Sequence, residues 1–462
     1  MFTVKDILKA TKGRLLSSAK QEEDMLTGVS TDTRRLKGGE LFVAIKGERF
    51  DGHNFVLDAV SRGAGGILVQ EGCITNSNFK IPDISFISVL DSIKALGSIA
   101  NLHRSRFEVP LIGITGSNGK TTTKEMIAAI LSKRLSVLKN FGTENNHIGV
   151  PLTLMRLRPE HKVAVLEMGT NHLGEIRRLS EIAMPTMAVI TNIGPSHLEY
   201  LKDTKTVLKA KCEILEYLDK DKGAKLVLNA DDELLSSIKT KLKTITFGLD
   251  KAYDFYADKL NLEPDGINFR LNGKHEISLG VVGRHNVYNV LGAIAASWDF
   301  GVTIDEIREA LSEFRIPNMR MEVKRIGDIR IINDSYNSNP LSMKTAIESL
   351  KDITTKGRKI LVAGDMLELG NFAGRFHHLV GRQAAESGID LIVAVGKLAE
   401  HVSKGAQEAG MNEKKIKLCN LTKEACGAVA NLIKKGDTIL VKGSRAMKME
   451  QIVEELERTK KA

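Results

Sequence analysis

The chain has 462 residues, of which 42% are hydrophobic and 27% are charged, so it can bury about three cores at the usual ~150 residues per domain. The net charge is +10, but only 5% of the residues are aromatic and no arginine-rich patch or nucleic-acid motif stands out. The composition therefore disfavours a nucleic-acid partner. Anionic small substrates, or a lineage bias in composition, explain the charge as well.

The four cysteines contain no Cys-x-x-Cys pair, so neither a zinc site nor a disulfide framework is indicated. The N-terminus lacks a basic segment followed by a long apolar run, and no stretch approaches the ~20 apolar residues that span a bilayer. We expect a cytoplasmic protein that does not insert into a membrane.

Residues 1–84 predict a small N-terminal α/β domain, because short apolar runs flanked by glycine turns occur at 38–47 and 63–69. Residues 91–104 have the pattern of a helix, with Asp91 as its N-cap, that leads into a second domain.

The second domain, residues 85–314, contains four continuous apolar runs at 111–115, 163–166, 188–193 and 226–228. Continuous runs are typical of parallel strands that are covered on both faces. In residues 266–279, apolar and polar residues alternate on either side of Asn272-Gly273. This pattern predicts a hairpin with a two-residue turn at the edge of the main sheet.

The third domain, residues 315–462, has strand candidates at 329–332, 360–363, 391–395 and 439–441 with helices between them. This pattern predicts a doubly wound, Rossmann-like domain. Its turn Gly364-Asp365-Met366 does not match Gly-x-Gly-x-x-Gly, so no dinucleotide site is expected there. The fold class is therefore α/β with three domains.

The segment 111–123 has the order strand, glycine loop, helix. Gly116 and Gly119 let the backbone curl, and the inward N–H groups at a helix N-terminus form a nest for phosphate oxygens. Lys120 can reach the terminal phosphates and the Thr121 hydroxyl can bind Mg²⁺. Ile114 replaces the first glycine of the general motif. A plain glycine turn with a solvated Lys120 is the alternative, which the flanking strand and helix disfavour.

Two polar residues follow predicted strands of the same sheet. Glu167 follows the run 163–166, so its carboxylate points into the ligand crevice and can hold a metal on the nucleotide phosphates. A helix-capping or surface glutamate is the alternative. His197 follows the run 188–193, and a neutral imidazole can bind a divalent ion, although an isolated histidine after a strand is more often structural.

Lys211 lies on the apolar stripe of a predicted helix over 205–218, whereas Lys209, Glu213 and Glu216 are expected to face away from it. A buried lysine has a lowered pKa and can react as a neutral amine. A lysine whose ammonium snorkels to solvent remains an open alternative.

Three further polar clusters have both a functional and a structural interpretation. His285 and Asn289 share one face of a helix start, where Asn289 suits either an adenine edge or a capping cluster. The loop 333–340 is either a turn or a ligand loop. The run 442–445, Lys-Gly-Ser-Arg, follows a strand and suits either an anion or solvent.

Taken together, these motifs closely resemble the Mur ligases of peptidoglycan synthesis, over nearly the whole chain. The matching segments are 29–34, 42–53, 115–122, 145–151, 210–214, 285–289, 334–340, 364–370 and 442–445. The last three resemble the member of the family that joins D-alanyl-D-alanine to UDP-N-acetylmuramoyl-tripeptide.

The resemblance implies a role for each matching position. ATP would be held by Gly116, Ser117, Asn118, Gly119, Lys120, Thr121, Thr122, His285, Asn289, Arg320 and Asp334. Thr121, Glu167, His197 and Lys211 would hold Mg²⁺, with Lys211 carbamylated to serve as a carboxylate, and Lys120, Glu167, His197 and Lys211 would be catalytic. The substrates would be bound by Ser30, Thr31, Lys46, Asn145, Asn146, Tyr336 and Asn337. Cys212 and Asn333 depart from the family pattern, which has glycine and aspartate there.

The implied reaction is ATP-driven amide formation through an acyl phosphate, by a monomer. A sibling that adds the third amino acid usually carries Asp-Asn-Pro-Arg, which is absent here. A nucleotide-gated binding module without ligase activity is the alternative from another class. It would keep the phosphate loop but would need neither Lys211 nor the polar loop at 333–340.

Overall fold

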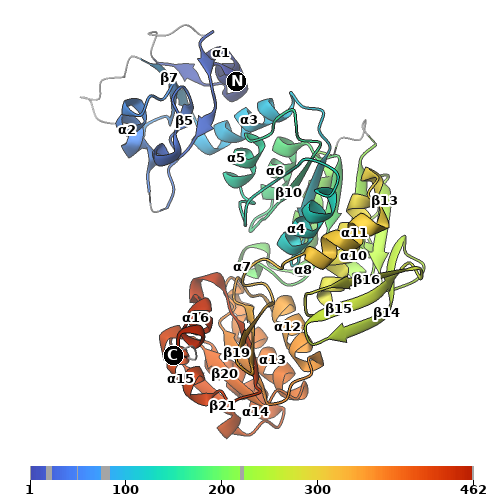
Figure 1. Ribbon diagram of the computed structural model, residues 1–462. Helices are drawn as coiled ribbons and strands as arrows, with labels where there is room; N and C mark the ends of the chain where they lie inside the picture. Colours follow the sequence, from blue (N-terminus) through green and yellow to red (C-terminus); the bar gives the residue numbers. More distant parts are fainter. Residues whose placement is uncertain (1, 17–22, 49, 74–83, 219–222, 460–462) are drawn as a thin grey trace.

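The computed structural model describes residues 2–16, 23–48, 50–73, 84–218 and 223–459. Figure 1 shows three α/β regions in chain order, with the blue N-terminal region joined to the rest through helix α3 (Ser92–Arg104) and the orange and red C-terminal region at the opposite end. No helix within these described ranges is long and apolar enough to cross a bilayer. The three-domain α/β architecture expected from the sequence is confirmed.

The first region is a five-stranded sheet in the order β2-β7-β6-β5-β4, parallel except for β2. Its elements are β2 (Arg14–Leu15), β4 (Val29–Ser30), β5 (Leu41–Val43), β6 (Gly66–Gln70), β7 (Ser85–Val89), α1 (Val4–Thr11) and α2 (Val56–Ser61), beside the small pair β1 (Phe2–Thr3) and β3 (Met25–Leu26). Strand β7 pairs with β6 of this sheet but lies after residue 84, the predicted end of the first domain. We therefore propose that the domain boundary follows β7.

Helix α3 begins where the sequence predicted. The Asp91 carboxylate accepts hydrogen bonds from the backbone N–H groups of Ile93 and Lys94 at 3.0 and 2.9 Å, as an N-cap does. The Asn101 amide donates to the carbonyls of Glu181 and Ile182 at 3.0 and 3.1 Å, which fixes α3 against the central region.

The central region is a nine-stranded sheet in the order β16-β15-β14-β13-β12-β11-β8-β10-β9, parallel from β14 to β9. Its strands are β8 (Leu111–Thr115), β9 (Val137–Lys139), β10 (Val163–Glu167), β11 (Met187–Ile190), β12 (Lys225–Asn229), β13 (Lys243–Gly248), β14 (Phe255–Glu263), β15 (Gly266–Leu271) and β16 (His275–Leu279). Its helices are α4 (Lys120–Leu131), α5 (Gly149–Leu154), α6 (Glu175–Ala183), α7 (Leu198–Leu201), α8 (Thr204–Cys212), α9 (Glu233–Ser236), α10 (His285–Ser297) and α11 (Ile304–Glu313).

Helices cover both faces of this sheet, as the continuous apolar runs predicted. Ile112 and Ile114 of β8 point to one face and pack in one core with residues of α4 and α10, whereas Leu111 belongs to the core on the other face, with residues of α5 and α6. Strand β8 is therefore buried on both sides, and its carboxyl end opens directly into the glycine loop.

Two details of the central region differ from the prediction. Strand β11 ends at Ile190 rather than at residue 193, and the hydroxyl of the next residue, Thr191, donates to the Asn118 carbonyl at 2.5 Å. The hairpin contains the predicted turn, since Asn272 and Gly273 have positive φ, +49° and +69°, and the Lys274 N–H donates to the Leu271 carbonyl at 3.0 Å. The strand register nevertheless pairs Leu271 with His275, so three residues rather than two separate the paired positions.

The third region is a six-stranded sheet in the order β17-β18-β22-β19-β20-β21, parallel except for β17. Its elements are β17 (Glu322–Ile326), β18 (Ile329–Asp334), β19 (Lys359–Gly364), β20 (Leu391–Val395), β21 (Ile416–Cys419), β22 (Thr438–Lys442), α12 (Pro340–Asp352), α13 (Ala373–Glu386), α14 (Ala399–Glu408), α15 (Thr422–Leu432) and α16 (Glu450–Thr459). Strand β18 continues through Asn333 and Asp334, so the polar loop begins only at Ser335.

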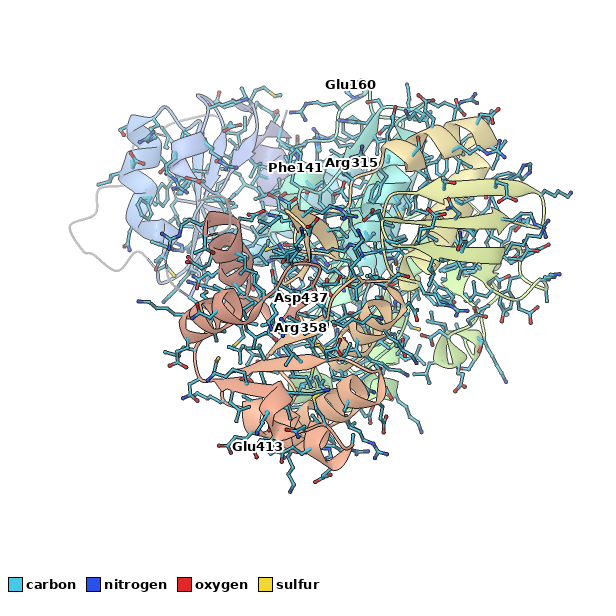
Figure 2. The ribbon with its side chains drawn as sticks, turned by 60° about the horizontal axis from the view of Figure 1, so that its bottom comes forward. Phe141, Glu160, Arg315, Arg358, Glu413 and Asp437 are labelled. Atoms are coloured by element: carbon cyan, nitrogen blue, oxygen red, sulfur yellow. The ribbon has the colours of Figure 1, made fainter. Side chains whose placement is uncertain are left out.

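An ion pair with a buried carboxylate braces this third region. The Arg358 guanidinium lies 2.6 Å from the carboxylate of Asp437, which is 1% exposed. The hydrogen bond to this carboxylate raises the pKa of Arg358 above its usual range. Both residues are labelled in Figure 2. The same carboxylate accepts from the backbone N–H groups of Arg358 and Lys434 at 2.9 and 2.8 Å, so it ties two loops together.

Candidate functional site

A cavity of about 1250 Å³ lies between the central and third regions. It is lined by most of the residues that the sequence pointed to, from the glycine loop, the ends of β10 and β18, the start of α10 and the loop after β18. The lining includes Ser117, Asn118, Gly119, Lys120, Thr121, Thr122, Asn145, Asn146, Glu167, His197, His285, Asn289, Arg320, Asp334, Tyr336 and Asn337.

The glycine loop needs its two glycines for different reasons. Gly116 has φ +142°, and a Cβ there would lie 2.0 Å from the Thr191 hydroxyl. Gly119 has φ +80° as the N-cap of α4, and a Cβ there would lie 2.3 Å from the side-chain oxygen of Asn289. The loop is therefore held in one shape by the strand β11 exit on one side and by α10 on the other.

Lys120 and Thr121 begin helix α4 and face the cavity. The Lys120 ammonium donates to the Gly116 and Ser117 carbonyls at 2.8 and 3.3 Å, and burial lowers the pKa of Lys120. The Thr121 hydroxyl donates to Glu167 at 2.7 Å, and the other carboxylate oxygen accepts from the Asn145 amide at 2.7 Å. A loop amide, a hydroxyl and a buried carboxylate thus meet beside the glycine loop.

The segment 140–145 that carries Asn145 is anchored by a lysine that sequence reasoning did not single out. Lys124 is fully buried in the first turns of α4, and its ammonium donates to the carbonyls of Asn140 and Gly142 at 2.8 and 3.0 Å. The Asn140 amide in turn pairs with the backbone of Glu167 at 3.0 and 3.2 Å. The backbone on both sides of the cavity carboxylate is therefore fixed.

Lys211 is 1% exposed on the inner face of α8, so the snorkelling alternative is wrong for this structure. Burial, and then the charge of Lys120, hold the pKa of Lys211 well below its usual range, although nearby carboxylates oppose the shift. The prediction that Glu213 faces away is also wrong. Glu213 is buried, and its carboxylate caps the start of α6 by accepting from the N–H groups of Gly174 and Arg177 at 2.7 and 3.2 Å.

His197 lies at the start of α7 and contacts the third region. Its Nδ1 lies 2.5 Å from the carboxylate of Glu368 in the loop after β19, and this hydrogen bond lowers the pKa of Glu368. Sequence reasoning placed His197 at the site but gave it no partner, because Glu368 lies 171 positions further along the chain.

His285 and Asn289 face the cavity from the first turn of α10. Burial lowers the pKa of His285 to about 4, so its ring is neutral, and its Nδ1 is buried without a hydrogen-bond partner in the part of the chain that the structure describes. The Asn289 side chain accepts from the Thr123 hydroxyl at 3.3 Å and donates to Asn286 at 2.8 Å. Its contact with Gly119 shows that Asn289 also shapes the glycine loop.

The third region contributes a charged pair and a stacked pair. The Asp334 carboxylate lies 2.6 Å from the ammonium of Lys442, which is 2% exposed, so the charge of Lys442 is already matched within the protein. The Arg320 guanidinium lies over the Tyr336 ring, 4.1 Å from its centroid, which is a cation–π contact. Arg320 and Asp334 both line the cavity.

Two hydrogen-bonded contacts join the central and third regions across the cavity. Asn118 of the glycine loop and Asn339, the N-cap of α12, exchange amide hydrogen bonds of 2.9 and 3.4 Å. The Tyr336 hydroxyl donates to the Thr143 hydroxyl at 2.7 Å. Asn339 and Thr143 were not predicted as site residues, because nothing in a short polar motif indicates which distant loop it faces.

Five predicted residues do not line the cavity. Ser30, Thr31 and Lys46 belong to the N-terminal region, whose sheet contributes no residue to the lining, Gly116 directly follows β8, and Lys211 is buried in α8. Arg49, within the segment 42–53, lies outside the described residues. The roles of these residues stay predictions.

The oxygen donors at the cavity suit one magnesium ion that also binds substrate phosphates, rather than a metal site made of protein ligands alone. Among the residues that the structure describes, no three or more His, Cys, Asp or Glu side chains form a metal-binding group. The Thr121 hydroxyl and Glu167 carboxylate are hard oxygen donors, 4% and 1% exposed, beside a phosphate nest. Mg²⁺ is usually bound by one or two such groups together with substrate phosphates, so these residues fit it.

Three family models match successive parts of the chain. They are described as "Mur ligase family, catalytic domain" over residues 25–104, "Mur ligase middle domain" over 114–297 and "Mur ligase, glutamate ligase domain" over 319–445. Together they span all three regions and the cavity.

Relatives named UDP-N-acetylmuramoyl-tripeptide–D-alanyl-D-alanine ligase match nearly the whole chain. The one from Bacillus subtilis is 37% identical over 98% of both chains, and the one from Escherichia coli is 36% identical over 94% of both. A crystal structure of MurF from Acinetobacter baumannii superposes with a TM-score of 0.88 at 32% identity, over 99% of both chains. MurF ligase from Thermotoga maritima in complex with ADP has a TM-score of 0.82 at 27% identity, over 94% of this chain and 98% of that one. The fold, the family models and the relatives agree, and the chain belongs to the Mur ligase family.

Proposed function

We propose that this protein is an ATP-dependent ligase that joins D-alanyl-D-alanine to UDP-N-acetylmuramoyl-tripeptide and so forms the pentapeptide precursor of peptidoglycan. The relatives named for this activity support it, since they cover 98% and 94% of the chain at 37% and 36% identity. The observation that carries the proposal is the contact of Thr121 with Glu167 at a phosphate nest, in a cavity that two domains share.

The reaction places two anions next to each other, and this chain supplies the groups that make the approach favourable. The tripeptide carboxylate attacks the γ-phosphate of ATP, which gives an acyl phosphate and ADP. The Ser117 and Asn118 N–H groups already donate to Asn192, so the N–H groups in the first turn of α4 and the Lys120 ammonium would stabilise charge on the phosphate oxygens. Mg²⁺, when bound, screens the remaining repulsion, and Thr121 and Glu167 would hold it.

The second step forms the amide. The amine of D-alanyl-D-alanine attacks the acyl carbon, and phosphate leaves through a tetrahedral intermediate. Both steps need reacting atoms at ~3–3.5 Å, so the domains must be held together around the substrates. The hydrogen bonds between Asn118 and Asn339 and between Tyr336 and Thr143 provide such a hold.

We infer that Lys211 is carbamylated. Burial lowers its pKa well below the usual range, which favours the neutral amine that reacts with carbon dioxide. The product would be a carboxylate where the sequence has only a lysine, near the charges of Glu167 and Glu175 that the ammonium senses. With His197, it would complete a second Mg²⁺ site.

The first domain would hold the uridine nucleotide through Ser30, Thr31 and Lys46, while Asn145 and Asn146 meet the sugar and peptide. Ile93, near the start of α3, also lines the cavity, so a substrate anchored on the first domain has a route to it. A nucleotide-linked substrate of this kind places the enzyme in the cytoplasm, and we retain a monomer as the proposed state.

The experiment that tests the proposal is product analysis by mass spectrometry. Purified protein is incubated with ATP, Mg²⁺ and UDP-N-acetylmuramoyl-tripeptide, with either D-alanyl-D-alanine or a single amino acid as acceptor. We expect the mass of the tripeptide nucleotide plus the dipeptide minus one water. A parallel incubation supplies the dipeptide-linked nucleotide and a single amino acid, and extension of that nucleotide by one residue would instead identify the sibling activity.

A further inference from the structure

The segment 364–370 is a rigid platform built by contacts from three directions. The Asp365 carboxylate accepts from the backbone N–H groups of Lys397 and Leu398 at 2.9 and 3.1 Å. The Met366 N–H donates to the His377 ring at 2.9 Å, and the Leu367 N–H donates to the Ser444 hydroxyl at 2.8 Å. The motifs 364–370 and 442–445 therefore meet, and together they present the next residue, Glu368.

Glu368 and His197 face each other with unusual backbone conformations. Glu368 has φ +60° and His197 has φ +53°, in the left-handed region that residues with a side chain seldom adopt. The Glu368 carbonyl accepts from the Glu199 N–H at 3.1 Å, so the two strained turns also bond through their backbones. Strain of this kind persists only where the surrounding structure over-determines it, and it concentrates at functional sites.

We propose that Glu368 is a positioning residue: from the third domain it fixes the ring of His197 in the tautomer whose Nε2 carries the lone pair. The contact that carries this is the 2.5 Å hydrogen bond between His197 Nδ1 and the Glu368 carboxylate. An ionised carboxylate only accepts hydrogen bonds, so Nδ1 must carry the hydrogen. In a neutral ring, Nε2 is then the free acceptor.

The proposed function requires the His197 tautomer with a free Nε2. The role assigned to Glu368 therefore rests on the proposed function. A neutral imidazole binds a metal or accepts a proton only through the nitrogen that lacks hydrogen. Both residues line the cavity, and metal-binding histidines commonly donate their other N–H to a carboxylate. Because Glu368 comes from the third domain, His197 acquires this form only when that domain is docked.

The direct test is the tautomer of His197 by nitrogen and carbon NMR of protein labelled at histidine. The spectra are recorded at about pH 8.5, above the ordinary imidazole range. The signals of His197 are identified by their loss in His197→Gln. We expect the ring hydrogen of His197 on Nδ1 in the unaltered protein. We expect the same in Glu368→Gln, because the amide oxygen can still accept that hydrogen bond. In Glu368→Ala we expect a shift toward Nε2–H.

Kinetics provide the second readout. Glu368→Ala is expected to lower kcat by about 10- to 100-fold, the usual cost of removing such an outer partner, with KM for D-alanyl-D-alanine little changed and with partial rescue in Glu368→Gln. The control is Glu413→Ala, which removes an exposed carboxylate that lies at the far tip of the same domain in Figure 2. We expect it to match the unaltered protein in both readouts.

Two outcomes overturn the proposal. One is a tautomer in Glu368→Ala identical to that of the unaltered protein. The other is a raised KM for D-alanyl-D-alanine at unchanged kcat, which would make Glu368 a binding group for the incoming amine. The NMR result needs neither ATP nor ligation. Failure of the proposed ligase activity would therefore leave it standing, and the two failures can be told apart.

Discussion

The Thr121 hydroxyl and the Glu167 carboxylate lie 2.7 Å apart although 46 positions separate them in the chain. Sheet register explains the meeting: β8 and β10 are parallel neighbours, and Glu167 pairs with Ile114, just before the glycine loop. The carboxyl ends of both strands therefore open at one edge of the sheet, where ligands of such folds bind.

Glu167→Gln should abolish most activity while keeping the fold. The amide has nearly the same shape and still accepts from Thr121, but it removes the negative charge that would hold Mg²⁺. We expect kcat to fall by at least about 100-fold, which corresponds to about 2.7 kcal/mol of transition-state stabilisation. Steady-state rates of phosphate release measure this. Glu160→Gln, at a solvent-exposed position labelled in Figure 2, is the matched control. Comparable rates for the two variants would show that the Glu167 charge has no such role.

Lys211→Ala should be nearly inactive and should regain activity with added short carboxylic acids. The substitution leaves a space where the proposed carbamate stood, and a small carboxylate can fill it. Ligation rates with and without formate or acetate give the comparison. Normal activity in the variant without any added acid contradicts the carbamate.

Tyr336→Phe should weaken the hold between the domains by one hydrogen bond. The ring and its contact with Arg320 remain, while the 2.7 Å bond to Thr143 is lost. A net loss of about 1 kcal/mol predicts a roughly fivefold lower kcat/KM for ATP. Tyr256→Phe, on the hairpin strand β14, is the control and should show no change. Equal values for both variants would mean that the Tyr336 contact is not used during turnover.

His285 should make the protein less stable in acid. Burial lowers its pKa from 6.5 to about 4, so between these values the unfolded chain binds a proton that the folded chain does not. Stability therefore falls as the pH drops through this window, by up to about 3 kcal/mol from this group at pH 4. Urea unfolding of the unaltered protein and of His285→Gln across pH 4–7 isolates the effect. The variant should show a shallower loss, and parallel curves would rule the contribution out.

Local pattern was sufficient to predict the strands and helices that surround the site. The order strand, glycine loop, helix is encoded within 111–123. The apolar stripe placed Lys211 on the inner face of its helix but left burial and snorkelling both open, and the structure shows burial at 1% exposure. These features depend on neighbours in the chain. The roles predicted for the site residues came from the resemblance to a family, and most of these residues line one cavity.

What could not be predicted depends on distance along the chain. The amide pair of Asn118 and Asn339 joins positions 221 residues apart, and the contact of His197 with Glu368 spans 171. Glu213 was misjudged for the same reason, because the helix start that it caps lies in another segment. Helical periodicity predicts which face of a helix is apolar. It does not predict that a carboxylate on the other face is buried by a neighbouring N-terminus.

The central claim is that a phosphate-activated acid on one substrate is joined to the amine of another in the shared cavity. Release of inorganic phosphate from ATP, with Mg²⁺ and UDP-N-acetylmuramoyl-tripeptide present, measures this directly when D-alanyl-D-alanine is varied. The account predicts that phosphate release rises with the dipeptide and saturates, with one phosphate for each amide formed. Phosphate release that ignores the dipeptide would contradict it.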